Sequence, residues 1–197
     1  MSMVEKREAR KQIRSVLKSL SPSYLSAQSA SACERLIATT AWREASTVTC
    51  YCSMAAEFQT RRLLEAAFED RKRVFLPRVL SIATRDMRML EASSLEAIDS
   101  WPKSKWGIPE PPTGASPTTL DLVVVPGVAF DARGGRLGQG AGFYDAWLAS
   151  LGPPRPLVVA LALDEQIVDA VPMDPHDIPI DMVLTPSGPL KLPISGI

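Results

Sequence analysis

Two uninterrupted apolar runs dominate the hydrophobic pattern of the second half of the chain. Residues 122–125 (LVVV) and 157–163 (LVVALAL) contain no polar position, and the segments 47–52, 73–77 and 180–185 are also rich in strand-forming residues. Strands without polar alternation are usually buried on both faces, as in a parallel sheet that helices cover on both sides. The pattern therefore predicts an α/β fold with a mostly parallel central sheet.

Apolar side chains recur at helical intervals in other parts of the chain. Residues 4–19 have this spacing, and the dipeptide Ser21-Pro22 then offers a capping serine and a proline at the first position of a second helix. Thr60 is a candidate cap for a third helix, and residues 143–151 are expected to form a fourth. The helices are thus expected to separate the predicted strands.

Less regular segments complete the chain. Met87 and Met89 alternate with charged residues, as in a half-buried strand, and the strand that starts at residue 73 is expected to end at Pro77. Residues 101–117 are rich in proline and predict a loop. Because no repeat or linker divides the sequence, we expect a single domain that spans residues 1–197.

The charge balance limits the partners of the protein. Its 22 basic and 22 acidic residues cancel, so no global field attracts nucleic acid or an anionic membrane, and we expect neither as a partner. No segment approaches the roughly 20 apolar residues of a membrane span. Residues 1–20 lack the apolar stretch of a signal peptide, so we expect a cytoplasmic protein.

Cysteine and histidine are scarce. Cys33, Cys50 and Cys52 are an odd and sparse set, which argues against a disulfide framework and for a reducing compartment. A zinc site would need all three together with His176, and the paired spacing of zinc ligands is absent. A hydrolase built on His176 would lack the Gly-x-Ser-x-Gly motif around a nucleophile.

The most informative segment is residues 136–145, with the sequence RLGQGAGFYD. Its three glycines, Gly138, Gly140 and Gly142, alternate with other residues between a leading arginine and a predicted helix. Glycines let the backbone approach a ligand closely, and a helix N-terminus favours anions, so the segment can bind phosphate. The sequence has no Gly-Lys pair and therefore no P-loop, and a glycine-rich hairpin or helix cap is an equally open interpretation.

Charged residues offer further candidates, each with an ordinary alternative. Lys6 and Arg10 share one face of the first helix, where they could hold phosphate oxygens or form part of a solvated face. Asp145 could bind Mg²⁺ or complement a helix dipole. Asp177 and Asp181 could also bind Mg²⁺, or they could shape the turns around neighbouring prolines.

Two further residues could recognise an organic ligand. Trp106, in the proline-rich loop, could stack on a planar ring or fill the core beneath the loop. Glu57 follows the strand predicted at residues 47–52, where it could accept amide-type N–H groups or lie in solvent.

Taken together, these segments resemble the 5-formyltetrahydrofolate cyclo-ligase family. The shared motifs are Lys6-x-x-x-Arg10, residues 53–60 (SMAAEFQT), residues 102–111 (PKSKWGIPEP), residues 125–145 with the glycine-rich segment, and His176-Asp177-x-x-x-Asp181. They follow the order of the family from about residue 6 to residue 186. The resemblance implies a three-layer α/β/α sandwich, in agreement with the buried strands.

The resemblance also implies a reaction. ATP and Mg²⁺ would support conversion of 5-formyltetrahydrofolate, with or without a polyglutamate tail, to 5,10-methenyltetrahydrofolate, with release of ADP and phosphate. The formyl oxygen would attack the γ-phosphate, and N10 would then close the ring as phosphate departs. Such an enzyme mainly positions its ligands and neutralises phosphate charge. We expect it to act as a monomer.

Site residues carried over from the family fall into three groups. ATP is expected to contact Lys6, Arg10, Arg136, Leu137, Gly138, Gln139, Gly140, Ala141, Gly142, Phe143 and Tyr144. The folate is expected to contact Cys52, Glu57, Trp106, Gln139, Gly140, Ala141, Gly142 and Phe143. Mg²⁺ is expected at Asp145 and Asp177, with Asp181 as a third candidate.

Three positions depart from residues that are common in the family. Gln139 replaces a tyrosine or basic residue, Ala141 a glycine or lysine, and Phe143 a tyrosine. Tyr144 is therefore the only tyrosine that we assign to the turn, and Ala141 is expected to have an ordinary φ. Two other classes remain open: a sugar-phosphate isomerase or acyl-carrier transferase that consumes no ATP, and a folate-binding protein without turnover.

Overall fold

A seven-stranded sheet organises the computed structural model, which describes residues 3–54 and 56–190. Its strand order is β3-β2-β1-β4-β7-β8-β9. The strands are β1 (Thr47–Thr49), β2 (Arg73–Ser81), β3 (Asp86–Ala92), β4 (Leu122–Val125), β7 (Leu157–Leu161), β8 (Met182–Thr185) and β9 (Gly188–Pro189). Strands β5 (Ala129–Phe130) and β6 (Arg136–Leu137) form a separate two-stranded sheet.

The five central strands of the sheet are parallel, and an antiparallel strand closes each edge. Strand β1 pairs in parallel with both β2 and β4, and the order then continues through β7 and β8. Strands β3 and β9 are the antiparallel edges. The chain therefore builds the sheet outward in both directions from β1 and β4, which makes the gap between them the topological switch point, where α/β proteins commonly bind ligands.

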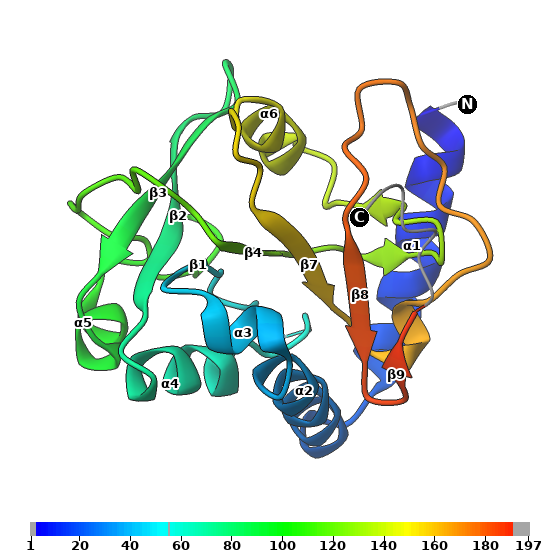
Figure 1. The fold of residues 1–197 in the computed structure, drawn as a ribbon. Coiled ribbons are helices and arrows are strands. Elements are labelled where there is room, and N and C mark those ends of the chain that lie inside the picture. Colours follow the sequence, from blue (N-terminus) through cyan, green and yellow to red (C-terminus); the bar gives the residue numbers. More distant parts are fainter. Residues whose placement is uncertain (1–2, 55, 191–197) are drawn as a thin grey trace.

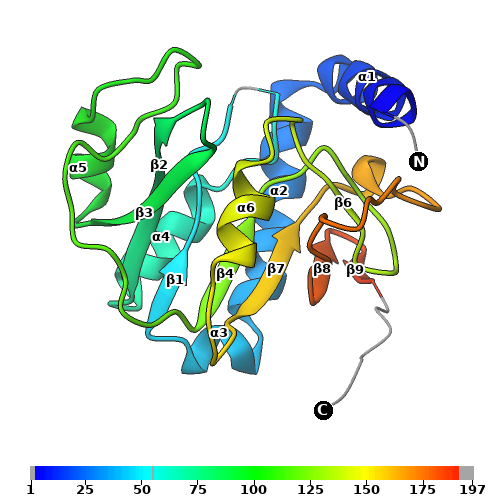
Figure 2. The ribbon, with the colours of Figure 1, turned by 90° about the horizontal axis from the view of Figure 1, so that it is seen from above.

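Helices cover both faces of the sheet, and the prediction of an α/β fold with a mostly parallel sheet is confirmed. Helices α2 (Pro22–Ile37), α3 (Thr40–Glu44) and α4 (Arg61–Glu69) lie on one face, and α6 (Phe143–Ala149) lies on the other (Figure 1). Helix α5 (Leu95–Ser100) follows β3, and a 3₁₀ helix, η1 (Asp164–Gln166), follows β7. Helix α1 (Met3–Ser19) lies beyond the ends of the strands (Figure 2).

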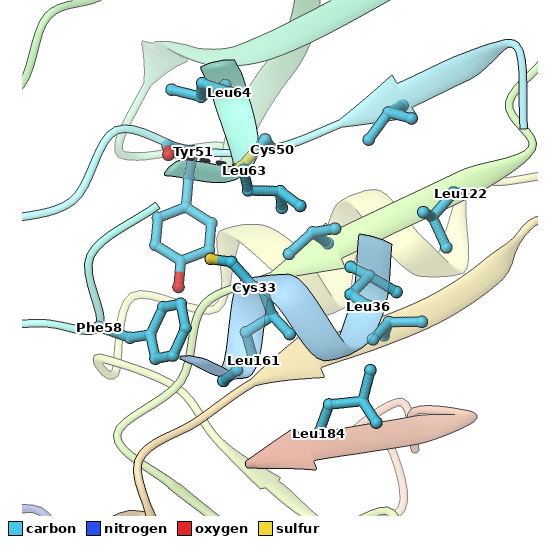
Figure 3. Close-up of a cluster of buried hydrophobic side chains, with 14 of the residues drawn as sticks. Cys33, Leu36, Cys50, Tyr51, Phe58, Leu63, Leu64, Leu122, Leu161 and Leu184 are labelled. Atoms are coloured by element: carbon cyan, nitrogen blue, oxygen red, sulfur yellow. Dashed lines mark hydrogen bonds between the residues drawn. The ribbon is translucent and has the colours of Figure 1, made fainter. Parts of the chain in front are cut away.

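The apolar runs divide their side chains between the two faces. Leu122, Leu161 and Leu184, from three adjacent strands, belong to the cluster beneath α2, where Figure 3 shows them near Leu36 and Cys33. The alternate residues of the same strands form a second buried cluster together with α6: Val123, Val125, Val158, Ala160 and Val183. Burial on both faces explains why these strands carry no polar alternation.

Two predicted strand boundaries were wrong. Strand β2 does not end at Pro77 but continues to Ser81. Its pairing with β1 ends at Phe75, whereas its pairing with β3 continues. Beyond Phe75 the strand is paired on the β3 side alone, so the missing N–H of Pro77 removes no bond from a central ladder. Strand β1 ends at Thr49 rather than at residue 52, and Cys50 and Cys52 therefore belong to the loop that follows.

A short hairpin, β5–β6, lies between β4 and the three glycines. The glycine-rich segment leads into helix α6 as expected, but its first residues, Arg136–Leu137, form β6, which pairs with β5. The carboxylate of Asp131 shapes the hairpin turn, since it accepts the backbone N–H groups of Arg133 and Gly135 at 2.8 and 2.9 Å. The hairpin thus positions the glycine-rich segment at the carboxyl end of β4.

Within the described residues, no helix has the length and apolar character needed to cross a membrane.

Candidate active site

Residues predicted to carry the chemistry meet at the carboxyl ends of β1, β4 and β7. The loop after β1 carries Glu57, the hairpin after β4 leads to the glycine turn (residues 138–142), and the segment after β7 carries Asp177. Helix α1 lies over the same end of the sheet (Figure 2). The structure therefore brings together segments that are distant in the sequence.

Two glycines of the turn have backbone conformations that other residues rarely adopt. Gly140 has φ +109° and Gly142 has φ +76°, both in the left-handed region that favours glycine. Gly142 is also the N-cap of α6. Ala141 between them does not have a positive φ, as expected, and its side chain is exposed.

A guanidinium group faces the position that a Cβ atom would take on each of the three glycines. The nearest guanidinium atom would lie 3.1 Å away for Arg136 at Gly138, and 3.5 Å away for Arg10 at Gly140. Arg85, from the turn between β2 and β3, faces Gly142 at 3.4 Å. A Cβ would crowd Arg136 only at Gly138; at Gly140 and Gly142 it would be in ordinary contact with the guanidinium, so the left-handed φ favours glycine there.

Arg136 lies inside the protein and is paired with Asp145. The two side chains are only 3% and 20% exposed, and Arg136 Nη2 donates to Asp145 Oδ1 at 2.7 Å. Nη1 of Arg136 donates to the carbonyl of Pro126 at 3.2 Å, while its buried Nε has no hydrogen-bond partner among the described residues. The structure thus joins a residue predicted for phosphate to one predicted for Mg²⁺.

The neighbours of Arg136 on the turn are less exposed to a ligand than the glycines. Leu137 is buried in β6, so only its backbone can face a bound molecule. Phe143 packs against a small cluster that contains Phe75 and Met89. Tyr144 lies beneath the Arg136 guanidinium, 5.9 Å from ring centroid to Cζ, and its buried hydroxyl has no partner among the described residues. Burial raises the pKa of Tyr144, so this hydroxyl stays protonated.

Lys6 of α1 is held by two carboxylates. Its Nζ lies 2.7 Å from Asp174 Oδ2 and also contacts Asp177 Oδ2. Although burial alone would lower the pKa of Lys6, hydrogen bonds to Asp174 and Asp177 raise it. Asp177 also accepts the backbone N–H of Asp174 at 2.7 Å. The ammonium group therefore fastens α1 to the segment that follows β7.

The same segment offers oxygen ligands for a divalent cation. Ligand atoms of Asp174, His176 and Asp177 lie within 4.8 Å of one another, and the backbone N–H of Ile178 donates to Asp145 Oδ1 at 3.4 Å. Carboxylate oxygens from two adjacent segments suit Mg²⁺, a hard cation that prefers such ligands. The donor set therefore fits the cation that the resemblance implies.

Asp181 is not brought to this group. It immediately precedes β8, where its Oδ2 accepts the backbone N–H of Val158 at 2.7 Å and its Oδ1 lies 3.6 Å from Arg155. This position is at the amino ends of the parallel strands, whereas the glycine turn lies at their carboxyl ends. These contacts give Asp181 a structural partner at the start of β7.

Glu57 and Gln139 meet across the switch point. Gln139 Nε2 donates to Glu57 Oε1 at 2.5 Å, and Glu57 Oε2 accepts the backbone N–H of Met54 at 3.0 Å. Arg14 of α1 in turn donates to the side-chain oxygen of Gln139, and to its backbone carbonyl at 3.3 Å. Ala55, which belongs to the same shared motif as Glu57, lies outside the described residues.

The other two residues predicted for the folate lie at the edge of this region. Cys52 is half-buried, and burial raises the pKa of its thiol to about 11, so it is a neutral lining group. Trp106 is 44% exposed and does not fill the core; the ammonium of Lys105 lies 4.7 Å from its ring centroid. Its indole therefore has surface available for a planar ligand.

Three residues of this region were missed by the sequence analysis: Arg14, Arg85 and Asp174. Arg14 had a local signal, because it follows Arg10 by one helical turn. Asp174 was visible only as part of a turn beside proline. Arg85 had none, since no pattern indicates that the β2–β3 turn reaches the glycine turn, more than 50 residues later.

Comparison with known proteins identifies the family of this chain. A family model described as the 5-formyltetrahydrofolate cyclo-ligase family matches residues 2–186. The chain belongs to this family. It is therefore an ATP-dependent cyclo-ligase of folate metabolism, with 5-formyltetrahydrofolate and ATP as the implied substrates, and its assignment to the family from sequence motifs is confirmed.

Relatives match this cyclo-ligase over most of its length. The 5-formyltetrahydrofolate cyclo-ligase of Mus musculus is 32% identical over 193 residues, which cover 93% of this chain and 95% of the relative. A relative from Arabidopsis thaliana, described as mitochondrial, is 29% identical over 93% of this chain and 75% of its own. The solved 5,10-methenyltetrahydrofolate synthetase of Aquifex aeolicus superposes with a TM-score of 0.82 at 27% identity, covering 98% of this chain and 95% of that one.

Proposed function

We propose that the glycine turn binds the triphosphate of ATP while Glu57, Cys52 and Trp106 receive the folate. The observation that supports this assignment is the row of guanidinium groups that faces the three glycines. Left-handed glycines open the backbone, and the cations supply the charge that a triphosphate needs. Gln139, which contacts the Glu57 loop, borders both ligands.

The proposed reaction proceeds in two displacements. The formyl oxygen attacks the γ-phosphorus, an O–P bond forms, and the bond to the β-phosphate breaks to release ADP. N10 then attacks the formyl carbon and releases its proton to water, and the C–O bond breaks as inorganic phosphate leaves with the electron pair. Phosphorylation turns a poor leaving group into a good one, so the protein contributes mainly orientation and charge stabilisation.

Lys6, Arg10 and Arg136 take distinct parts in this proposal. Arg10, whose Nε donates to the Gly138 carbonyl at 2.7 Å, is positioned to contact phosphate directly. Lys6 reaches the phosphates on release from its carboxylates. Arg136 is buried and acts from beneath the turn, with its charge balanced by Asp145.

Asp145 and Asp177 would hold Mg²⁺, with Asp174 beside Asp177. The cation supplies positive charge that offsets the triphosphate. We do not assign Asp181 to this set, because it binds the backbone at the start of β7. We further propose that the enzyme acts as a monomer in the cytoplasm on folates with or without a polyglutamate tail, although the Arabidopsis relative shows that cyclo-ligases are not confined to one compartment.

Absorbance of 5,10-methenyltetrahydrofolate, measured with and without ATP and Mg²⁺, tests the reaction. Arg10→Ala is expected to lower kcat/KM for ATP at least tenfold, because it removes a hydrogen bond from a charged group to phosphate, worth about 1.5–3 kcal/mol. Arg7→Ala, an exposed position on the same helix, is the matched control. Folate binding without ATP-dependent product, or an Arg10→Ala variant with unchanged kinetics, contradicts the assignment.

A further inference from the structure

We propose that Arg85 is an anion-binding residue of the active site, which takes an oxyanion of one of the two substrates. This inference rests on the proposed function and extends it to a segment that the glycine-rich motif does not include. The phosphates of ATP and the glutamate carboxylates of the folate both present such oxygens. The experiment below distinguishes them.

The position of the Arg85 guanidinium is the first argument. Its Cζ, Nε and Nη1 atoms all lie 3.4 Å from the position of a Cβ on Gly142. Equal distances place the flat group face-on above the glycine. Because the N–H bonds lie in the plane of the guanidinium, they point along the surface of the turn rather than into it. They are therefore directed toward a molecule that lies on the turn.

Arg10 has the same arrangement one glycine earlier. Its Cζ, Nε and Nη1 atoms lie 3.5–3.7 Å from the Cβ position of Gly140. Arg10 comes from α1 and Arg85 from the β2–β3 turn, so two unrelated segments present the same group to alternate glycines of one turn. A ligand on the turn would thus meet a cation from each side.

The donors of Arg85 are also unused. No ion pair or hydrogen bond joins its side chain to any residue in 3–54 or 56–190. The other arginines of β2 and β3 do have partners: Arg73 with Glu91 at 2.7 Å, Arg88 with Asp86 at 4.0 Å, and Arg78 with the carbonyl of Pro111 at 3.0 Å. Among the arginines of this hairpin, Arg85 is the one with neither an ion pair nor a side-chain hydrogen bond to a described residue.

The carboxylates of the site already have partners. Asp145 is paired with Arg136, and Asp174 and Asp177 are paired with Lys6. The carboxylate of Glu57 accepts from Gln139 and from the backbone. Because no described residue forms an ion pair with Arg85, its charge is available to an incoming anion.

The backbone of Arg85 allows a clean experiment. Its φ of +54° lies in the left-handed region, where glycine fits without a steric cost, so Arg85→Gly removes the guanidinium while keeping the turn. Arg85→Lys keeps the charge and loses the flat fork of donors. Arg88→Ala, also exposed and on the same hairpin, is the matched control.

Calorimetric titration of each variant with a non-hydrolysable ATP analogue plus Mg²⁺, and separately with 5-formyltetrahydrofolate, gives both dissociation constants without turnover. Arg85→Gly is expected to weaken one of them about tenfold, with partial recovery in Arg85→Lys, wild-type values in Arg88→Ala and an unchanged melting temperature.

Weaker binding of the analogue assigns Arg85 to phosphate. Weaker binding of the folate assigns it to the glutamate carboxylates, and the effect must then vanish with a 5-formyltetrahydropterin that lacks the aminobenzoylglutamate group. Wild-type dissociation constants for both substrates in Arg85→Gly overturn the inference. The proposed function is tested by a different variant: it fails when Arg10→Ala leaves binding of the ATP analogue unchanged.

Discussion

At the scale of single residues, glycine has two separate tasks in this active site. Gly140 and Gly142 supply left-handed backbone, while Gly138 has no positive φ and only leaves room for the Arg136 guanidinium. The glycine spacing was visible in the sequence. The second task was not, because it depends on which cation the fold brings to each position.

Gly142→Ala separates the backbone conformation of the turn from its proposed contact with phosphate when it is compared with Gly107→Ala. Both glycines have φ +76°, but no atom lies within 4 Å of a Cβ on Gly107, whereas a Cβ on Gly142 would contact Arg85. Each substitution is expected to lower the free energy of unfolding by about 1–2 kcal/mol, the cost of left-handed backbone in an L-residue. Urea denaturation measures this cost.

Only the Gly142 substitution is expected to raise KM for ATP, by about tenfold, since its methyl group covers the backbone surface proposed to approach phosphate. Equal KM values for ATP in the two variants would mean that the turn serves the fold alone.

At the scale of elements, α1 shows how much a sequence pattern can reveal. Its spacing predicted a helix, which the structure confirms, with an apolar set of Val4, Ile13, Val16, Leu17 and Leu20. Ile13 and Leu17 are buried, whereas Val4 and Val16 are exposed. The pattern could not reveal that its basic face docks on the glycine turn and on the segment after β7, because these partners lie more than 100 residues away. Arg10, for example, binds the Gly138 carbonyl.

Lys6→Met tests whether α1 is fastened through its ammonium group. We expect faster hydrogen exchange in the first turns of α1 at neutral pH, while the amides of α2 are unchanged. A hydrogen bond from Lys6 lowers the pKa of Asp174, so the pair is fully formed above the ordinary Asp pKa of about 3.9 and is lost as pH falls through the lowered value.

The difference in α1 exchange between wild type and Lys6→Met should therefore be constant from pH 7 to 5 and shrink below about pH 4. A difference that is absent at pH 7, or that is equally large at pH 3, would show that the ammonium group does not fasten the helix. Mass spectrometry of exchanged peptides provides the measurement.

At the scale of the whole molecule, strand order creates the site. Continuous apolar runs predicted a mostly parallel sheet, which the structure confirms. The order of the strands is not written in local patterns, since it depends on long-range pairing. Glu57 and Gln139 are 82 positions apart and meet only because β1 and β4 are neighbours. The family motifs identified both residues without revealing their contact.

This contact makes Gln139 a competitor for the folate. Its amide donates to the Glu57 carboxylate, which is the group proposed to accept the N–H donors of the pterin. Binding of the pterin must first break this hydrogen bond, at a cost of about 1 kcal/mol. Gln139→Ala removes the competitor and is therefore expected to bind 5-formyltetrahydrofolate about fivefold more tightly in the absence of nucleotide.

Calorimetric titration of wild type, Gln139→Ala and Gln12→Ala, an exposed position of α1, tests this expectation. Only the first substitution should change the dissociation constant. Because Arg14 holds the other end of the Gln139 side chain, Arg14→Ala should tighten folate binding in the same direction but less. Weaker folate binding in Gln139→Ala would instead mean that the amide contacts the folate directly.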